Sequence, residues 1–167
     1  MTQKPKVLFL NATAHDLTEA QKRTIPALMD ALFGKGNVEY EVVDFKEDNP
    51  ELYKKLTNMK FEDDRSELEE RFLAYLNSKV VKWDAIVLHL PIGSPAFTTE
   101  MGLALGFALS QGQYFVNPVV SFTERKVEEE KLEDGTVRKV SKFEFKGFQV
   151  LFSTLKVPAV KDTRKLL

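Results

Sequence analysis

The loop formed by residues 92–96 is the first stretch whose side chains could do chemistry. It places a glycine and a serine directly after an apolar run and ahead of a segment with helical spacing. Unpaired N–H groups at the positive end of a helix dipole form a place where an anion, typically a phosphate, would sit. Turns and helix caps need the same residue types, so a purely structural role is an equal alternative. The candidate ligand contacts here are Ile92, Gly93, Ser94, Pro95, Ala96, Thr98 and Thr99, with Thr98 or Thr99 as the helix cap.

A second group of polar and cationic side chains follows the next expected strand, residues 114–122. If that strand lies beside the one that precedes the loop, Ser121, Thr123, Arg125 and Lys126 come near Gly93. Arginine offers a planar fork to phosphate oxygens and lysine a compact mobile charge. The two cations would then complete a polyphosphate or phosphodiester site. A solvated hairpin of mixed charge is the competing interpretation, and we prefer it for residues 128–131.

A parallel sheet is needed to bring these groups together. Residues 85–90 are almost unbroken apolar, which is typical of a strand covered on both faces. Residues 6–10 predict a second buried strand, and residues 39–45 predict a weaker one. Helical spacing fills the segments between them, in the order βαβααβα. This order predicts an α/β fold with a Rossmann-like, doubly wound and mainly parallel sheet.

Helix starts are marked by short polar signals. Thr18 with Gln21, and Ser66 with Glu69, each have the spacing of a capping box. Asn49 is followed by a proline, the order expected of an N-cap and the first helical residue. We therefore expect one helix after each of these three signals.

The carboxyl-terminal part of the chain changes to an antiparallel pattern. From Thr123 the residues alternate between polar and charged types, and Asp134 with Gly135 favours a tight hairpin turn. Residues 136–152 would form the return strand. We expect one domain over residues 1–167, with a hairpin extension over about residues 119–152.

Composition limits the classes of function. The chain has 167 residues, of which 43% are hydrophobic, and 24 basic and 25 acidic residues give a net charge of −1. No overall field would draw it to DNA or to an anionic membrane, so an anion site must be local. The chain has no cysteine and only two histidines, which removes thiol chemistry and makes a metal site improbable. We expect no cofactor, no metal, no membrane span and a cytoplasmic location.

Two segments of the chain resemble a known family. The run TERKVEEEKLEDGTVRKVSKFEFKGFQVL resembles the carboxyl-terminal hairpin of small CRISPR-associated Rossmann-like proteins of the CARF type. The run VLFLNATAHDLTEAQ resembles the opening of their stand-alone ancillary members, whereas residues 34–82 match only in element order. The resemblance implies binding of a cyclic oligoadenylate, commonly the tetramer, across the two-fold axis of a homodimer. In several members it also implies metal-independent cleavage of that ring.

The resemblance also implies roles for individual residues. The first-strand loop with Asn11, Ala12, Thr13 and His15 would hold ribose and phosphate, residues 93–96 would cradle the ligand backbone, and Arg125 and Lys126 would balance developing charge. Thr13, His15 and Lys126 are the candidate catalytic residues. Ring-cleaving relatives often have a serine or threonine where this chain has Asn11, and that departure concerns catalysis more than binding.

Three functions remain open at this point. The first is a ring nuclease that cleaves the ligand by attack of its own 2′-hydroxyl, and the second is a sensor or sequestering protein that binds the ring intact. The third is a nucleoside deoxyribosyltransferase-like enzyme with Glu100 as the nucleophile. A homodimer is expected for the first two, and aromatic residues could form its contact, although core packing explains them equally well. These residues are Phe143, Phe145, Phe148 and Phe152.

Overall fold

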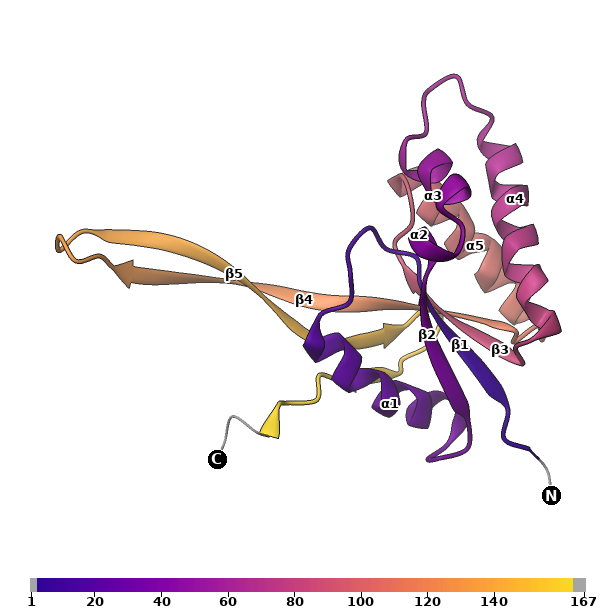
Figure 1. Cartoon of the computed structure of the whole chain (residues 1–167), viewed down its shortest axis with the longest axis horizontal. Helices are drawn as coiled ribbons and strands as arrows, with labels where there is room; N and C mark the ends of the chain where they lie inside the picture. The colour runs from indigo at the N-terminus through magenta and orange to yellow at the C-terminus, as the bar shows by residue number, and fades with distance from the viewer. Residues whose placement is uncertain (1–2, 164–167) are drawn as a thin grey trace.

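The fully buried strand β3 lies inside one six-stranded sheet, in the part of the chain that the computed structural model describes, residues 3–163 (Figure 1). The strand order is β2-β1-β3-β4-β5-β6. The first four strands run parallel, β5 is antiparallel to β4, and β6 is antiparallel to β5. The predicted Rossmann-like α/β fold is confirmed. The strands are β1 (Lys6–Asn11), β2 (Glu39–Asp44), β3 (Ala85–Leu90), β4 (Val116–Lys131), β5 (Val137–Val150) and β6 (Lys156–Pro158).

Helices cover the two faces of the sheet unequally. α1 packs on one face, while α3, α4 and α5 pack on the other (Figure 1). One hydrophobic core lies on each face of the sheet, and alternate residues of β1 point into each of them. Val7 and Phe9 pack toward α1, and Leu8 and Leu10 pack toward the other helices. None of the helices within residues 3–163 is long and apolar enough to cross a bilayer. The helical elements are α1 (Glu19–Phe33), α2 (Phe45–Asp48), α3 (Pro50–Thr57), α4 (Arg65–Ser78), the 3₁₀ turn Lys79–Val81, and α5 (Pro95–Ser110).

Two of the three predicted helix starts are confirmed. Thr18 and Gln21 form a reciprocal capping box at the start of α1, with hydrogen bonds of 2.8 and 3.1 Å. Asn49 caps α3. The capping box at Ser66 is wrong, because Asp64 caps α4 and Ser66 lies inside the helix. A carboxylate at this position caps the helix and also interacts favourably with its dipole.

The helix after β3 begins earlier than the sequence analysis expected. Ser94 is the N-cap of α5, and Pro95 is the first helical residue. Thr98 and Thr99 therefore lie inside the helix, and the prediction that one of them caps it is wrong. The Thr98 hydroxyl instead holds the preceding loop, since it donates to the carbonyl of Ile92 at 2.6 Å and accepts from its N–H at 3.0 Å. Serine followed by proline is a strong start signal, which explains the earlier beginning.

Strands β4 and β5 continue far beyond the rest of the sheet as a two-stranded arm (Figure 1). The predicted turn at Asp134 and Gly135 forms its tip. A register shift lies between Phe122 and Thr123, opposite Gly147, at the point where the arm leaves the sheet. Such a bulge bends a strand and increases its local twist. The bulge therefore divides β4 into a segment inside the sheet and a segment in the arm.

Replacing Gly147 by alanine is expected to destabilise the base of this arm. The added Cβ would lie 2.2 Å from the backbone oxygen of Val157, and the φ of 149° is one that residues with side chains rarely adopt. We expect the free energy of unfolding, measured by urea titration, to fall by about 2 kcal/mol or more. Gly102 on α5 is the control, because its added Cβ meets nothing within 4 Å and should stabilise by roughly 0.5–1 kcal/mol. Equal effects at both positions would contradict this account.

Candidate functional site

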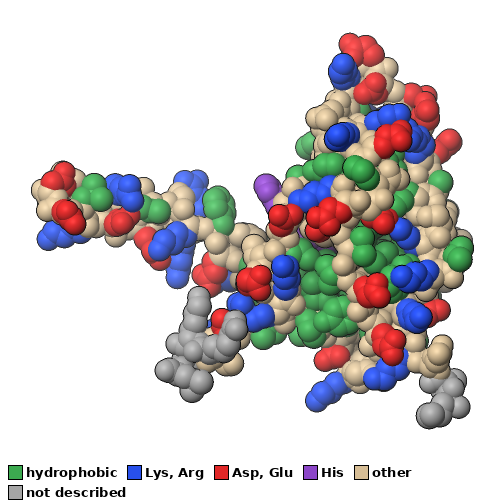
Figure 2. Space-filling model, viewed as in Figure 1, with side chains coloured by type: hydrophobic (Ala, Val, Ile, Leu, Met, Phe, Trp, Pro, Cys, Tyr) green, Lys and Arg blue, Asp and Glu red, His purple; other side chains and the backbone are tan. Residues whose placement is uncertain are grey.

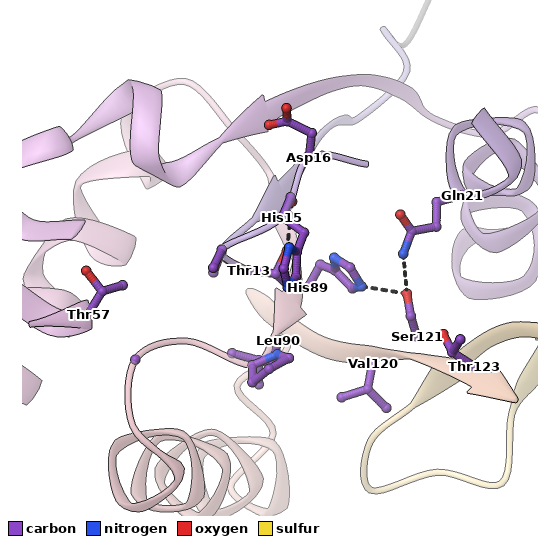
Figure 3. A pocket seen from close by; sticks show the side chains of 14 residues that line it. Thr13, His15, Asp16, Gln21, Thr57, His89, Leu90, Val120, Ser121 and Thr123 are labelled. Carbon is purple, nitrogen blue, oxygen red and sulfur yellow. Dashed lines mark hydrogen bonds between the residues drawn. The ribbon is translucent and has the colours of Figure 1, made fainter. Parts of the chain in front are cut away.

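An open hollow of about 510 Å³ lies at the carboxyl ends of β1 and β3, beside the part of β4 that leaves the sheet, residues 120–123 (Figure 3). The chain leaves β1 toward one side of the sheet, for β2, and leaves β3 toward the other side, for β4. In open α/β sheets such a switch point is where ligands bind. Among the residues that the sequence analysis singled out, those that line the hollow are Ala12, Thr13, His15, Gly93, Ser121 and Thr123.

The remaining predicted ligand contacts do not line this hollow. Ile92 is 1% exposed and belongs to the core, Ser94 and Thr98 are used in the start of α5 as described, and Thr99 donates to the carbonyl of Pro95 at 2.8 Å. Asn11 lies beneath the hollow, where its side chain is hydrogen-bonded to two residues that line it, Thr13 and His89. The full set outside the lining is Asn11, Ile92, Ser94, Pro95, Ala96, Thr98, Thr99, Arg125 and Lys126.

The two predicted cations lie on the arm and not at the hollow. Arg125 donates from its guanidinium to the Ser141 hydroxyl at 2.8 and 3.1 Å, and the Lys126 ammonium lies 4.0 Å from the Glu144 carboxylate. The prediction that they face the Gly93 loop is wrong for a single chain, because β4 runs on past the loop into the arm. Within residues 3–163, no lysine or arginine lines the hollow.

Three polar side chains from three neighbouring strands form a hydrogen-bonded chain at the floor of the hollow. The Nδ1 atom of His89, on β3, lies 2.9 Å from Oδ1 of Asn11 on β1. Its Nε2 atom lies 2.7 Å from Oγ of Ser121 on β4. Gln21, on α1, donates from Nε2 to the same Ser121 oxygen at 3.0 Å (Figure 3). The chain thus runs from α1 across the sheet to β1.

The hydrogen bonds of Asn11 determine which nitrogen of His89 carries the proton. The Asn11 amide nitrogen donates to Oδ1 of Asp44 at 2.9 Å and to the carbonyl oxygen of His15 at 2.9 Å. Both partners are acceptors, so the Asn11 oxygen must face His89. His89 therefore carries its proton on Nδ1 and presents the Nε2 lone pair to Ser121. The Ser121 hydroxyl consequently donates to His89 and accepts from Gln21.

Burial keeps the imidazole of His89 neutral. The residue is 2% exposed, and the rings of Phe9 and Phe148 each lie 5.7 Å from it, centroid to centroid. Loss of hydration lowers the pKa of His89 to about 4. At neutral pH the ring is therefore an uncharged acceptor for the Ser121 proton.

An ion pair lies at the rim of the hollow. Lys46, just after β2, donates a hydrogen bond to Asp16, which lines the hollow. That hydrogen bond lowers the pKa of Asp16 and raises that of Lys46. The positive charge of Lys46 is thus already partnered. Within residues 3–163 no cluster of three or more histidine, aspartate or glutamate side chains could hold a metal ion.

The sequence analysis missed the residue at the centre of this site, His89. It interrupts the otherwise apolar strand AIVLHL, and a lone polar residue at the carboxyl end of a buried strand is the signal that could have revealed it. Other lining residues carried no signal of a role in a site, although Gln21 was recognised as part of a capping box, because they come together only through the fold. These are Ala14, Asp16, Gln21, Thr57, Leu90, Pro91 and Val120.

Two further candidates from the sequence lie elsewhere. Glu100 lies in the second turn of α5, pairs with Arg65 of α4 at 2.6 Å, and does not line the hollow. The geometry therefore gives no support to Glu100 as a nucleophile in this site. Phe148 is fully buried in the core and is not free to form a dimer contact, whereas Phe143 is 74% exposed.

The sequence matches the uncharacterized protein MJ1673 family over residues 7–149. The chain belongs to this family. All residues that line the hollow fall within the matched span. The comparisons with curated proteins and with solved structures found no match. The function is therefore argued from the site itself.

The protein is expected to lose stability as the pH falls from about 6.5 to about 4, because of His89. Unfolding returns this side chain to its ordinary pKa of 6.5, so in this range the unfolded chain binds a proton that the folded protein excludes. The contribution of uncharged His89 to the free energy of unfolding is fully present above pH 6.5 and is lost as the pH falls through the pKa of His89 in the folded protein. It amounts to roughly 3 kcal/mol.

Urea titrations at about pH 7 and about pH 4.5 measure this effect on the wild type and on His89→Asn. Asparagine keeps a donor toward Asn11 but cannot titrate, so the variant should lose less stability between the two pH values. The same pH dependence in both proteins would show that His89 is not responsible.

Proposed function

We propose that two copies of this chain pair and bind one cyclic oligoadenylate, with cyclic tetra-adenylate as the first candidate, in their joined hollows. The observation that carries the proposal is the position of the hollow at the switch point between β1 and β3, where open α/β sheets bind nucleotides. The resemblance of residues 7–21 and 123–151 to CARF-type proteins favours the same class of ligand.

The walls of the hollow offer groups that suit a nucleotide. Hydroxyls of Thr13, Thr57 and Thr123 can donate to or accept from ribose and phosphate oxygens. The side chains of Leu90 and Val120 supply apolar surface for the face of a base. A mainly apolar wall with a few placed polar groups is the usual composition of a small-molecule site.

The size of the hollow favours a ligand shared between two copies. Its volume of about 510 Å³ lies in the range of sites for drug-sized molecules. A ring of four nucleotides is larger than such a molecule and has rotational symmetry of its own. Two hollows related by a two-fold axis would each hold half of the ring, which requires an isologous dimer.

The arm would supply the positive charge that the hollow itself does not contain. Arg125 and Lys126 lie at the base of the arm, beyond the bulge, and Figure 2 shows charged side chains of both signs along it. On the face of the arm that carries Arg125, Val127 is 56% exposed and Phe143 is 74% exposed. In the proposed dimer this face lies against the second copy, so that Arg125 approaches the ring phosphates, whereas the next residue, Lys126, projects from the opposite face of the arm.

Cleavage of the ring is the second half of the proposal. The ligand's own 2′-hydroxyl would lose its proton and attack the neighbouring phosphate, forming a 2′,3′-cyclic phosphate while the bond from phosphorus to the 5′-oxygen breaks and that oxygen leaves as a hydroxyl. The protein then needs only to align the groups and stabilise charge. Thr13 would position ribose, because its hydroxyl is anchored 2.7 Å from Oδ1 of Asn11. The exposed His15 would transfer a proton, and Arg125 would balance the charge; the role expected for Lys126 does not fit, because its side chain lies on the other face of the arm, beside Glu144. The alternative is a sensor that holds the ring intact.

We also propose a cytoplasmic location, for the ring nuclease and for the sensor alike, since a chain without cysteine suits a reducing compartment.

Calorimetric titration with cyclic tetra-adenylate, without added metal, tests this proposal. We expect one ring bound per two chains, and chromatography of the recovered ligand would separate cleavage from simple binding. Arg125→Ala should weaken binding by about tenfold or more, because it removes a charge-assisted contact with phosphate. Absence of binding at micromolar protein would overturn the proposal.

Lys139→Ala is the matched control for this experiment. Lys139 lies opposite Glu129, farther along the same arm, and its removal also takes away one positive charge. We expect no change in affinity. If both substitutions weaken binding equally, the arm attracts the ligand only through its overall charge and Arg125 makes no specific contact.

A further inference from the structure

The chain of hydrogen bonds from Asn11 through His89 to Ser121 has the connectivity of a nucleophilic catalytic triad. Oγ of Ser121 lies 2.7 Å from Nε2 of His89, and Nδ1 of His89 lies 2.9 Å from Oδ1 of Asn11. In such triads a serine donates to a histidine, which a third side chain orients through its other nitrogen. The arrangement is recognised by geometry and roles, and it occurs on unrelated folds.

The protonation pattern of these three residues agrees with those roles. As derived above, the bonds of Asn11 to Asp44 and to the carbonyl of His15 place the proton of His89 on Nδ1. The Nε2 lone pair is therefore directed at the Ser121 hydroxyl and at no other group. A histidine with the opposite tautomer could not accept the serine proton.

The surroundings of Ser121 place it within reach of a substrate. Ser121 lines the open hollow, whereas His89 is 2% exposed and Asn11 is 1% exposed beneath it. Apolar walls formed by Ala12, Pro91 and Val120 stand beside the serine. Because no lysine or arginine of the described chain lines the hollow, the surroundings of Ser121 suit an uncharged acyl group, and any anionic part of a ligand must lie outside them.

Donors for a developing oxyanion are present in the same hollow. Gly93 has a φ of 65° in the loop after β3, and within the described chain its backbone N–H donates no hydrogen bond. The same holds for the N–H of Ala14. Both residues line the hollow. Backbone N–H groups that are not otherwise used are the usual means of stabilising the oxyanion of acyl transfer.

We infer that Ser121 is a nucleophile of the serine-hydrolase type that acts on uncharged acyl esters. Its Oγ bonds to the acyl carbon while its proton passes to Nε2 of His89, and the proton then goes to the departing alcohol oxygen. Water attacks the resulting acyl-serine and gives its proton to His89, which returns it to Ser121 as the carboxylic acid leaves. Asn11 positions His89 throughout. The inference does not depend on binding of a cyclic oligoadenylate.

A fluorophosphonate probe tests this inference without knowledge of the natural substrate. Attack of Ser121 on the probe phosphorus expels fluoride and leaves one stable adduct per chain, which intact mass and peptide mapping would place on Ser121. We expect Ser121→Ala to abolish labelling and His89→Asn to slow it by about 100-fold or more. Hydrolysis of 4-nitrophenyl acetate should fall in the same order.

Ser110→Ala is the control, since Ser110 is exposed at the end of α5 and its hydroxyl donates to the carbonyl of Phe107. It should leave the labelling rate unchanged. Thermal unfolding of each variant separates loss of chemistry from loss of fold. Absence of an adduct on folded wild-type protein, or labelling that persists in folded Ser121→Ala, would overturn the inference. A rate that His89→Asn leaves unchanged would reduce Ser121 to a merely exposed hydroxyl and would overturn it as well.

Discussion

The hydrogen-bonded chain that joins three neighbouring strands through His89 is the constraint on which the site depends. A buried imidazole costs stability unless both of its nitrogens are paired, and here Asn11 and Ser121 pair them. Both partners are in turn held, Asn11 by Asp44 and Ser121 by Gln21. The positions of β1, β3, β4, the end of β2 and α1 are thereby linked at one point. These bonds fix the floor of the hollow, to which Ser121, His89 and Gln21 contribute lining side chains.

Beyond the floor of the hollow, β4 leaves the sheet and continues as the arm. β4 passes Ser121 and shifts register at Phe122 and Thr123, and from there it pairs only with β5. A two-stranded ribbon has little stability alone in water, and the exposed Val127 and Phe143 on one face of the arm are consistent with the pairing of two copies that we propose. Cross-strand ion pairs such as Glu130 with Arg138 satisfy the opposite face. The arm is thus amphipathic, with one face partnered internally and the other available.

Sequence reasoning recovered the features that local chemistry determines. The apolar runs of β1 and β3, the Thr18 capping box and the Asp134 turn each follow from neighbouring residues, and each is confirmed. The failures concern groups whose place depends on the path of the chain in three dimensions. Nothing near Arg125 in the sequence reveals that β4 runs straight past the loop after β3. His89 was overlooked because an apolar run was read as structural, although a polar residue inside such a run needs partners from other strands.

The distribution of charge separates two tasks in the molecule. Within residues 3–163 no lysine or arginine lines the hollow, and Lys46 at its rim is held by Asp16, so Ser121 and His89 lie where the imidazole stays unprotonated at neutral pH. The arm carries its charges outside the hollow, where water screens them and where they can contact the parts of a large ligand that do not enter. An anionic ligand must therefore place its charge outside the floor of the hollow. The proposed recognition of charge by the arm and the inferred reaction at Ser121 are therefore physically separable, and changing the arm should alter the first without disturbing the second.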